Sequence, residues 1–197
     1  MKPLCFLALF VFAVRGDKTA EEYIDIVIKK AIEQVPHPLH LPDFEGWAEY
    51  TEGVAWGLDE LERVGPTNVI INENSHTFEG RLGVDEVAGR YKWRKYIIHK
   101  IRSGFAFVKA SNFTIDIRVR QDLEPKAHAE LEYLKIVNMD EIDVEMTGLS
   151  YLSWIISGIV DPLANKFEEQ LAGFVEKNLR AALENEFKHV RLPILEE

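Results

Sequence analysis

The middle of the chain alternates apolar and polar residues with a period of two, and this pattern restricts the fold more than any other feature. Between positions 110 and 120, Phe113, Ile115, Ile117 and Val119 alternate with polar or charged residues. A period of two places one set of side chains against a core and the other set in water. We therefore expect an antiparallel sheet with one solvated face.

Strand-like segments follow one another without a helix between them. Turn-forming sequences such as 72–75 (NENS) and 102–104 (RSG) separate them. A doubly wound parallel sheet needs a helix between successive strands, so this order excludes that class. The expected strands lie near residues 47–64, 67–72, 76–84, 87–99, 104–120, 127–137 and 141–147, with Ala129, Leu131, Tyr133, Ile142, Val144 and Met146 on apolar faces.

Helical patterns lie at both ends of this strand-rich region. Residues 19–35 contain no Gly or Pro and place their apolar residues on one helical face. A second amphipathic stretch runs from Asp161 to about Val190. Residues 146–160 carry no charge but are fewer than the roughly 20 that span a bilayer, so we expect a buried helix there. The fold class is α+β, with residues 17–197 as one domain.

Residues 1–16 (MKPLCFLALFVFAVRG) have the layout of a secretory signal peptide, with one lysine before a short apolar run. Cleavage would remove Cys5, the single cysteine, so the secreted protein would contain no disulfide. Asn112, followed by Phe113 and Thr114, forms an N-glycosylation acceptor triplet. We therefore expect a secreted protein, with Asn112 as its candidate glycosylation site.

The net charge of −10 argues against a general nucleic-acid binder and disfavours simple electrostatic attachment to anionic membranes. No common catalytic or nucleotide-binding motif is present. His37 and His40 lie in a proline-rich loop without a patterned acidic partner, and the acidic pairs on the strands point to solvent. We therefore predict no enzymatic activity, no cofactor and no metal site.

Several short motifs resemble those of the group 7 mite allergens. They are residues 57–65 (GLDELERVG) with Asn68 and Val69 shortly after, then 148–152 (GLSYL) and 161–163 (DPL). The resemblance implies a super-roll fold, in which a curved antiparallel sheet wraps around long helices. It also implies kinship with the bactericidal/permeability-increasing, juvenile-hormone-binding and takeout proteins, which hold lipids or other hydrophobic molecules.

The expected function is therefore that of a secreted carrier of a lipid or similar hydrophobic ligand, held in an apolar gap between sheet and helix. The alternative is a protein-interaction module with a fully packed core, and homodimerisation stays open. No nucleic-acid partner and no stable membrane anchor are expected. The expected lining residues are Phe105, Phe107, Phe113, Ile115, Trp154, Ile155, Phe167 and Leu171.

Overall fold

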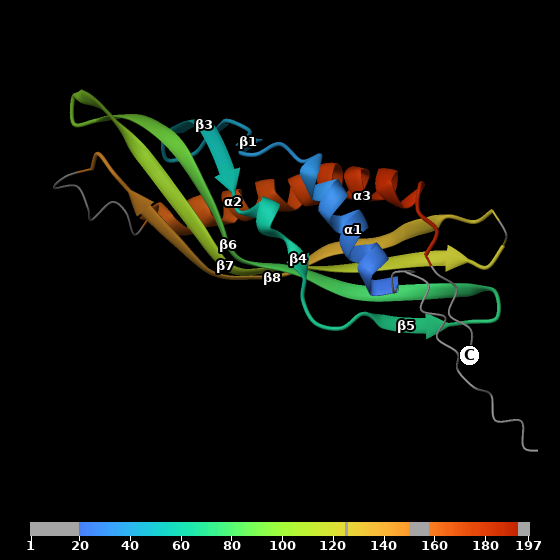
Figure 1. Cartoon of the computed structure of the whole chain (residues 1–197). Coiled ribbons are helices and arrows are strands. Elements are labelled where there is room, and N and C mark those ends of the chain that lie inside the picture. The colour runs from blue at the N-terminus through green and yellow to red at the C-terminus, as the bar shows by residue number, and fades with distance from the viewer. Residues whose placement is uncertain (1–19, 125, 150–157, 193–197) are drawn as a thin grey trace, which may run out of the picture.

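A computed structural model describes residues 20–124, 126–149 and 158–192 of the chain. The predicted signal peptide at 1–16 and the predicted lining residues Trp154 and Ile155 lie outside these ranges, as does most of the uncharged stretch 146–160. The described residues form an α+β fold, with one large antiparallel sheet and helices on one of its sides (Figure 1).

The sheet contains eight strands in the order β1-β3-β6-β7-β8, with β2 paired to β3 and both β4 and β5 paired to β6. Figure 1 shows that the long strands bend near their middle and curve toward the helices. The strands are β1 (Leu39–Leu41), β2 (Phe44–Glu45), β3 (Glu49–Trp56), β4 (Glu62–Arg63), β5 (Asn68–Ile71), β6 (Ser75–Ile97), β7 (Lys100–Asp122) and β8 (Ala129–Met146).

The long strands are more continuous than the sequence predicts. Segments 76–84 and 87–99 join in β6, and 127–137 and 141–147 join in β8. The turn predicted at 102–104 is wrong, because β6 and β7 connect through Ile98 and His99. Gly104 instead lies inside β7, where a side chain would clash with the Thr147 carbonyl at 2.2 Å. This glycine therefore permits a close backbone approach and does not end a strand.

The helices are α1 (Ala20–Glu33), α2 (Val160–Phe174) and α3 (Arg180–Phe187), and a π-helical segment (Val175–Leu179) joins the last two. A 3₁₀ turn (Leu58–Glu60) precedes β4. The predicted helix at 19–35 and the predicted C-terminal helical stretch are both present. Each helix buries one apolar face, and α1 contacts α3 as well as β4.

The alternation of side chains reverses once along the two longest strands. In β7, Ala106, Val108 and Ala110 are fully buried, and burial then continues at Phe113 and Ile115 with the opposite parity. The break lies at Asn112, whose backbone is left-handed with φ 51°, and β7 changes register against β8 there. β6 reverses at the same level, between Leu82 and Val87. The break is therefore at the centre of both 23-residue strands.

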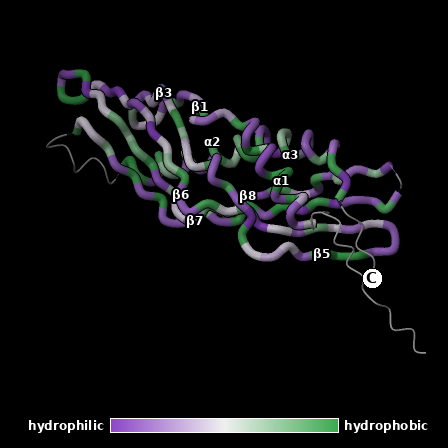
Figure 2. The backbone as a smooth tube through the Cα atoms, in the orientation of Figure 1, coloured by the Kyte–Doolittle hydropathy of each residue, from purple (hydrophilic) through white to green (hydrophobic). Residues whose placement is uncertain are grey.

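A second irregularity corrects the predicted face of β8. Ala129 and Leu131 are buried as expected, but Tyr133 is exposed and Leu134 is buried in its place. The register between β7 and β8 shifts between Arg118 and Val119, opposite this point. Such bulges insert a residue that a pattern of period two does not reveal. The hydropathy in Figure 2 accordingly alternates along the strands without long uniform blocks.

Candidate functional site

An apolar layer lies between the inner face of the sheet and the helices, where the sequence places the ligand. Phe167 of α2 packs directly on Gly89 of β6, where an added Cβ would lie 2.3 Å from the phenyl ring. The glycine thus provides the space in which the helix seats on the sheet. The other fully buried residues of this layer include Phe78, Leu82, Ile115, Val119, Leu171, Leu183 and Phe187.

Four of the predicted lining residues belong to this layer. Phe113, Ile115, Phe167 and Leu171 are all completely buried and share one core with the rest of the inner face. Their burial shows that sheet and helix meet tightly at this level. A ligand in the predicted gap would therefore have to lie beside these residues or displace them.

Phe105 and Phe107 point to the other face of the sheet. Ala106 and Val108, their neighbours in β7, are in the core, so the two phenylalanines face outward. Their rings lie 6.3 Å apart, and the Arg90 guanidinium stacks 5.1 Å from the Phe105 ring. The prediction grouped them with Phe113 as one lining, but the reversal at Asn112 separates the two sets. A gap on the helix side would not contain Phe105 or Phe107.

The sheet is longer than the helices that cover it. β6 and β7 each have 23 residues, or about 75 Å of extended chain. The helical run from Val160 to Phe187 is about 42 Å long. Several side chains of β6 and β8 that pack on the core are only partly buried: Ile97, Met139, Ile142, Val144 and Met146. The described helices therefore leave part of this apolar surface uncovered.

Aromatic side chains gather where β2, β3 and β6 meet. Phe44 stacks on Tyr50 with ring centroids 4.6 Å apart and meets Tyr91 edge-on at 5.2 Å. Trp47 and Trp93 lie alongside, with centroids 5.8 Å apart. The sequence prediction missed this aromatic cluster, which we define as these five residues. The alternation of Tyr91 and Trp93 with Lys92 and Arg94 could have revealed it.

The two tyrosines of the aromatic cluster differ in their polar contacts. The Tyr91 hydroxyl donates to Gln170 Oε1, and Gln170 Nε2 donates to the Pro42 carbonyl at 3.1 Å. The Tyr50 hydroxyl is buried without a hydrogen-bond partner in the described part of the chain. Burial raises the pKa of Tyr50 to about 12. Burial, followed by the negative charge of Asp43, also raises the pKa of Tyr91.

A separate surface cleft of about 800 Å³ lies between α1 and the segment that leads into β4. Ile28, Ile32 and Leu61 form its apolar floor. Its rim carries five carboxylates against one lysine and one arginine, so its local charge is unfavourable for an anionic ligand head group. The charged lining residues are Asp25, Glu33, Asp59, Glu60, Glu62, Lys29 and Arg63.

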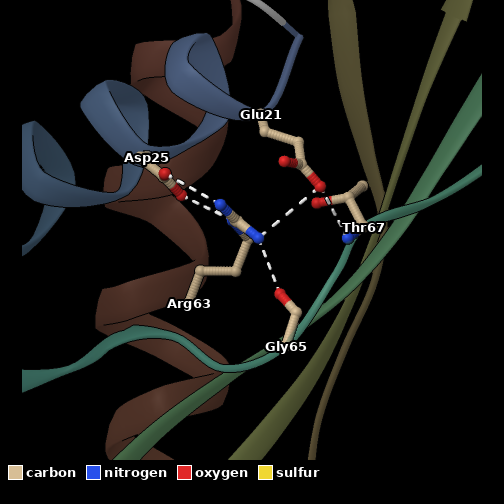
Figure 3. Close-up of polar contacts among 5 residues, drawn as sticks. All are labelled: Glu21, Asp25, Arg63, Gly65 and Thr67. Atoms are coloured by element: carbon tan, nitrogen blue, oxygen red, sulfur yellow. Dashed lines mark hydrogen bonds and ion pairs between the residues drawn. The ribbon is translucent and has the colours of Figure 1, made fainter.

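Arg63 fixes one wall of this cleft. Its guanidinium donates to both carboxylate oxygens of Asp25, at 2.7 and 3.1 Å, and to the Gly65 carbonyl at 2.6 Å. Glu21 lies 3.6 Å from Arg63 and also accepts a hydrogen bond from the Thr67 backbone (Figure 3). The hydrogen bond to Asp25 is the main reason that the pKa of Arg63 is raised. These contacts attach α1 to the β4–β5 side of the sheet.

Histidines and acidic residues are the candidate metal ligands in the described part of the chain. His37 lies 3.9 Å from Asp59, and within the described ranges no three His, Cys, Asp or Glu residues gather as a set of metal ligands.

Asn112 of the glycosylation triplet is exposed at the bend of β7. No helix among the described residues combines the length and apolar character required to cross a bilayer.

The sequence matches the profile of a family described as Group 7 allergen over residues 18–187. No curated protein matches the chain. Takeout 1 of Epiphyas postvittana has a similar solved structure, with a TM-score of 0.47, 14% identity, and coverage of 86% of this chain and 88% of that one. A lipopolysaccharide binding protein is similar with a TM-score of 0.42 and 16% identity, over 84% of this chain and 38% of that one.

Proposed function

The chain belongs to the group 7 allergen family, and on that premise we propose that it is a secreted, non-enzymatic binder of a hydrophobic ligand such as a fatty acid or another lipid. In this proposal residues 17–197 form one lipid-binding domain, and residues 1–16 direct its secretion. Asn112 then carries a glycan, which its exposed position would accommodate.

The observation that carries this proposal is the partial burial of Ile97, Val144 and Met146 on the inner face of the sheet. These side chains lie on the same face as the packed core, and Val144 is in the ladder row of Val108 and Gly89, where Phe167 of α2 packs. An acyl chain placed there would remove apolar surface from water, at about 25 cal/mol per Å² before the costs of association. The ligand would extend the existing core and would not need to displace it.

The aromatic cluster supplies the polar end of this site. Tyr50 is opposite Trp93 in the β3–β6 ladder, and its buried hydroxyl has no hydrogen-bond partner in the described part of the chain. A buried hydroxyl without a partner costs about 1–3 kcal/mol, and a ligand carbonyl or hydroxyl could recover that cost. The cleft beside α1 is a poorer site for a fatty acid, because its carboxylate-rich rim would repel the head group.

The test is native mass spectrometry of the secreted protein, with extraction of bound molecules and titration with a fluorescent fatty acid. Val144→Asp places a charge on the inner face of β8, and we expect at least about a tenfold loss of affinity, or 1.4 kcal/mol. Val137→Asp is the matched control, because Val137 belongs to the same strand but is exposed. Circular dichroism and thermal melts establish that both variants are folded.

Equal affinity in the two folded variants would refute the inner-face site. If the wild-type protein purifies empty and takes up none of a broad panel of apolar probes, it has a packed core. The protein-interaction module would then become the better interpretation.

A further inference from the structure

The positive charges of this acidic protein are concentrated around one hairpin. Residues 87–115 contain seven Lys or Arg residues and no Asp or Glu. The rest of the chain contains 33 acidic and 16 basic residues. Although the net charge is −10, the sequence around the connection between β6 and β7 is therefore basic. In Figure 1 this hairpin projects beyond the helices at one end of the molecule.

The tip of this hairpin exposes large apolar side chains. Tyr96, Ile98 and Ile101 have exposed fractions of 65%, 65% and 67%, the highest among the exposed large hydrophobic residues of the described chain. Tyr96 and Ile101 are opposite each other in the β6–β7 ladder, and Ile98 lies in the turn itself. In Figure 2 the tip combines hydrophobic and hydrophilic residues within a few positions. The three side chains form one small apolar tip.

The turn is unfavourable for the residues that occupy it. Ile98 and His99 have φ angles of 48° and 61°, in the left-handed region that two-residue hairpin turns fill with Asn-Gly. A β-branched residue in this region is strained. Local strain of this kind is characteristic of functional segments, because stability alone would favour asparagine and glycine here. The strained backbone of Ile98 destabilises the fold, and because its side chain is exposed, burial in the core does not offset that cost.

Basic side chains surround the apolar tip. Lys92 pairs with Glu52 and Arg94 with Glu49, and these two carboxylates come from β3. Lys95 donates to the Trp47 carbonyl and lies 5.0 Å above the Trp47 ring. Residues 92–104, beyond the end of β8, contain five basic residues, so subtracting these two glutamates leaves a formal charge of +3 with His99 neutral.

We propose that the β6–β7 hairpin docks the protein reversibly on an anionic lipid bilayer. Ile98 and Ile101 would enter the boundary between head groups and acyl chains, and Tyr96 would lie at the interface that aromatic hydroxyl side chains prefer. Lysines and arginines around the tip would contact the anionic head groups. Charge complementarity favours this occupant. An acidic protein surface would pair with the basic side chains but would not bury the apolar tip, and a neutral apolar surface would do the reverse, whereas an anionic bilayer can do both.

The inner-face ligand site is not a premise of this inference, although the hairpin lies at the same end of the sheet. Docking requires only the apolar tip and the basic side chains around it. A protein that binds no ligand could still bind vesicles, and a ligand carrier could fail to do so. The two proposals can therefore fail separately.

The experiment is flotation of the full mature chain with vesicles of phosphatidylcholine containing about one third phosphatidylserine, and with pure phosphatidylcholine vesicles. We expect binding to the anionic vesicles that weakens as salt screens the charges, and at least about tenfold weaker binding to the neutral ones.

The decisive variant is the double substitution Ile98→Asn with His99→Gly. It replaces the apolar tip by the preferred turn sequence, so the protein should melt at the same or a higher temperature but bind anionic vesicles at least about tenfold less. Lys100→Glu should also weaken binding, and Lys126→Glu, at the other end of the sheet, is its matched control. Lys126 does not belong to the fatty-acid site proposed above, whereas Lys100 is the ladder partner of Ile97, so fatty-acid titration of Lys100→Glu accompanies the vesicle assay.

Unchanged vesicle binding in the double variant would overturn the role of the tip. Equal losses in Lys100→Glu and Lys126→Glu would show a general charge effect and overturn the role of the basic side chains around the tip. A wild-type protein that floats with neither vesicle overturns the proposal, and fatty-acid titration of the same sample would then test the ligand site independently.

Discussion

The two halves of the long strands share one hydrogen-bonded ladder but have different surfaces. In the closed half, which comprises residues 75–84 of β6 and 113–122 of β7, the inner-face side chains Phe78, Leu82, Phe113 and Ile115 are buried in the core. Cross-strand ion pairs cover the outer face of this half, including Arg81–Asp116 at 2.7 Å and Arg118–Glu79 at 2.6 Å. In the hairpin half, which comprises residues 87–110, basic residues predominate and large apolar side chains reach the surface.

The reversal at Asn112 explains how one pair of strands supports both surfaces. Each strand of the pair changes the face of its buried residues at the same level, so the pairing between β6 and β7 is kept. The bend that accompanies it directs the closed half toward the helices and carries the hairpin beyond them (Figure 1). The base of the hairpin half is also part of the core, with Tyr91, Trp93 and Val108 buried, and only the tip of the hairpin is left exposed to meet a surface.

The largest expected effect tests this reversal with two identical substitutions in β7. Phe113→Ala should cost about 3–5 kcal/mol, since a fully buried phenyl ring is lost from the core. Phe105→Ala should cost about 1 kcal/mol or less, because Phe105 is 38% exposed and loses mainly its contact with Arg90. Denaturant unfolding of both variants measures the difference. Equal losses would mean that the two residues share a face.

The fold was predictable from the sequence to the level of its elements and their order. Period-two alternation identified the strands, and the apolar helical faces identified the terminal helices. The faces of individual residues were predictable only between irregularities: Phe113 and Ile115 are in the core as expected, whereas Phe105, Phe107 and Tyr133 are not. A bulge or a left-handed residue changes the parity of everything beyond it, and no local pattern marks its position.

The candidate site was less predictable than the fold, because it depends on contacts between distant segments. Trp47 and Trp93 lie 46 positions apart in the sequence and meet only because β3 pairs with β6. The missing partner of the Tyr50 hydroxyl is likewise a property of packing. The hairpin charge, in contrast, was visible in the sequence, but averaging over the whole chain concealed it.

A second prediction concerns the attachment of α1 to the closed half. Arg63→Met keeps most of the side-chain volume but removes the hydrogen bonds to Asp25 and Gly65. We expect a loss of about 1.5–3 kcal/mol, the range for hydrogen bonds to charged groups. Hydrogen exchange should show the loss in α1, while amides of the β6–β7 hairpin remain unchanged. Equal deprotection of the hairpin would mean that the two halves unfold as one unit.

A third prediction has the opposite sign and concerns the aromatic cluster that packs on the hairpin half. Tyr50→Phe removes a buried hydroxyl that has no partner among the described residues, and it should raise the free energy of unfolding by about 1 kcal/mol. It should also reduce the affinity for a ligand with a polar head, while the affinity for a pure hydrocarbon stays the same. A destabilised variant would show that the hydroxyl has a partner in solution.

The raised pKa of Tyr50 also predicts how Tyr50→Phe changes the pH dependence of stability above pH 10. The unfolded chain ionises its tyrosines near pH 10, whereas Tyr50 in the folded protein stays neutral until about pH 12. The stability of the wild-type protein should therefore fall as the pH rises from about 10 to 12, since only the unfolded state releases the proton there. Melting temperatures across this range should fall less steeply in Tyr50→Phe, and an identical slope would assign the alkaline loss to other groups such as Tyr91.

The smallest effect is expected on the outer face of the closed half. Arg118→Ala removes an exposed ion pair with Glu79, so the cost should be only about 0.2–1 kcal/mol and should shrink in high salt. The same substitution at Lys100, in the hairpin half, should leave the free energy of unfolding nearly unchanged but weaken binding to anionic vesicles. Arg118→Ala should leave vesicle binding intact. This crossed result would show that basic residues stabilise the sheet in one half and meet a lipid surface in the other. A loss of vesicle binding in Arg118→Ala would instead mean that the whole outer face contributes its charge.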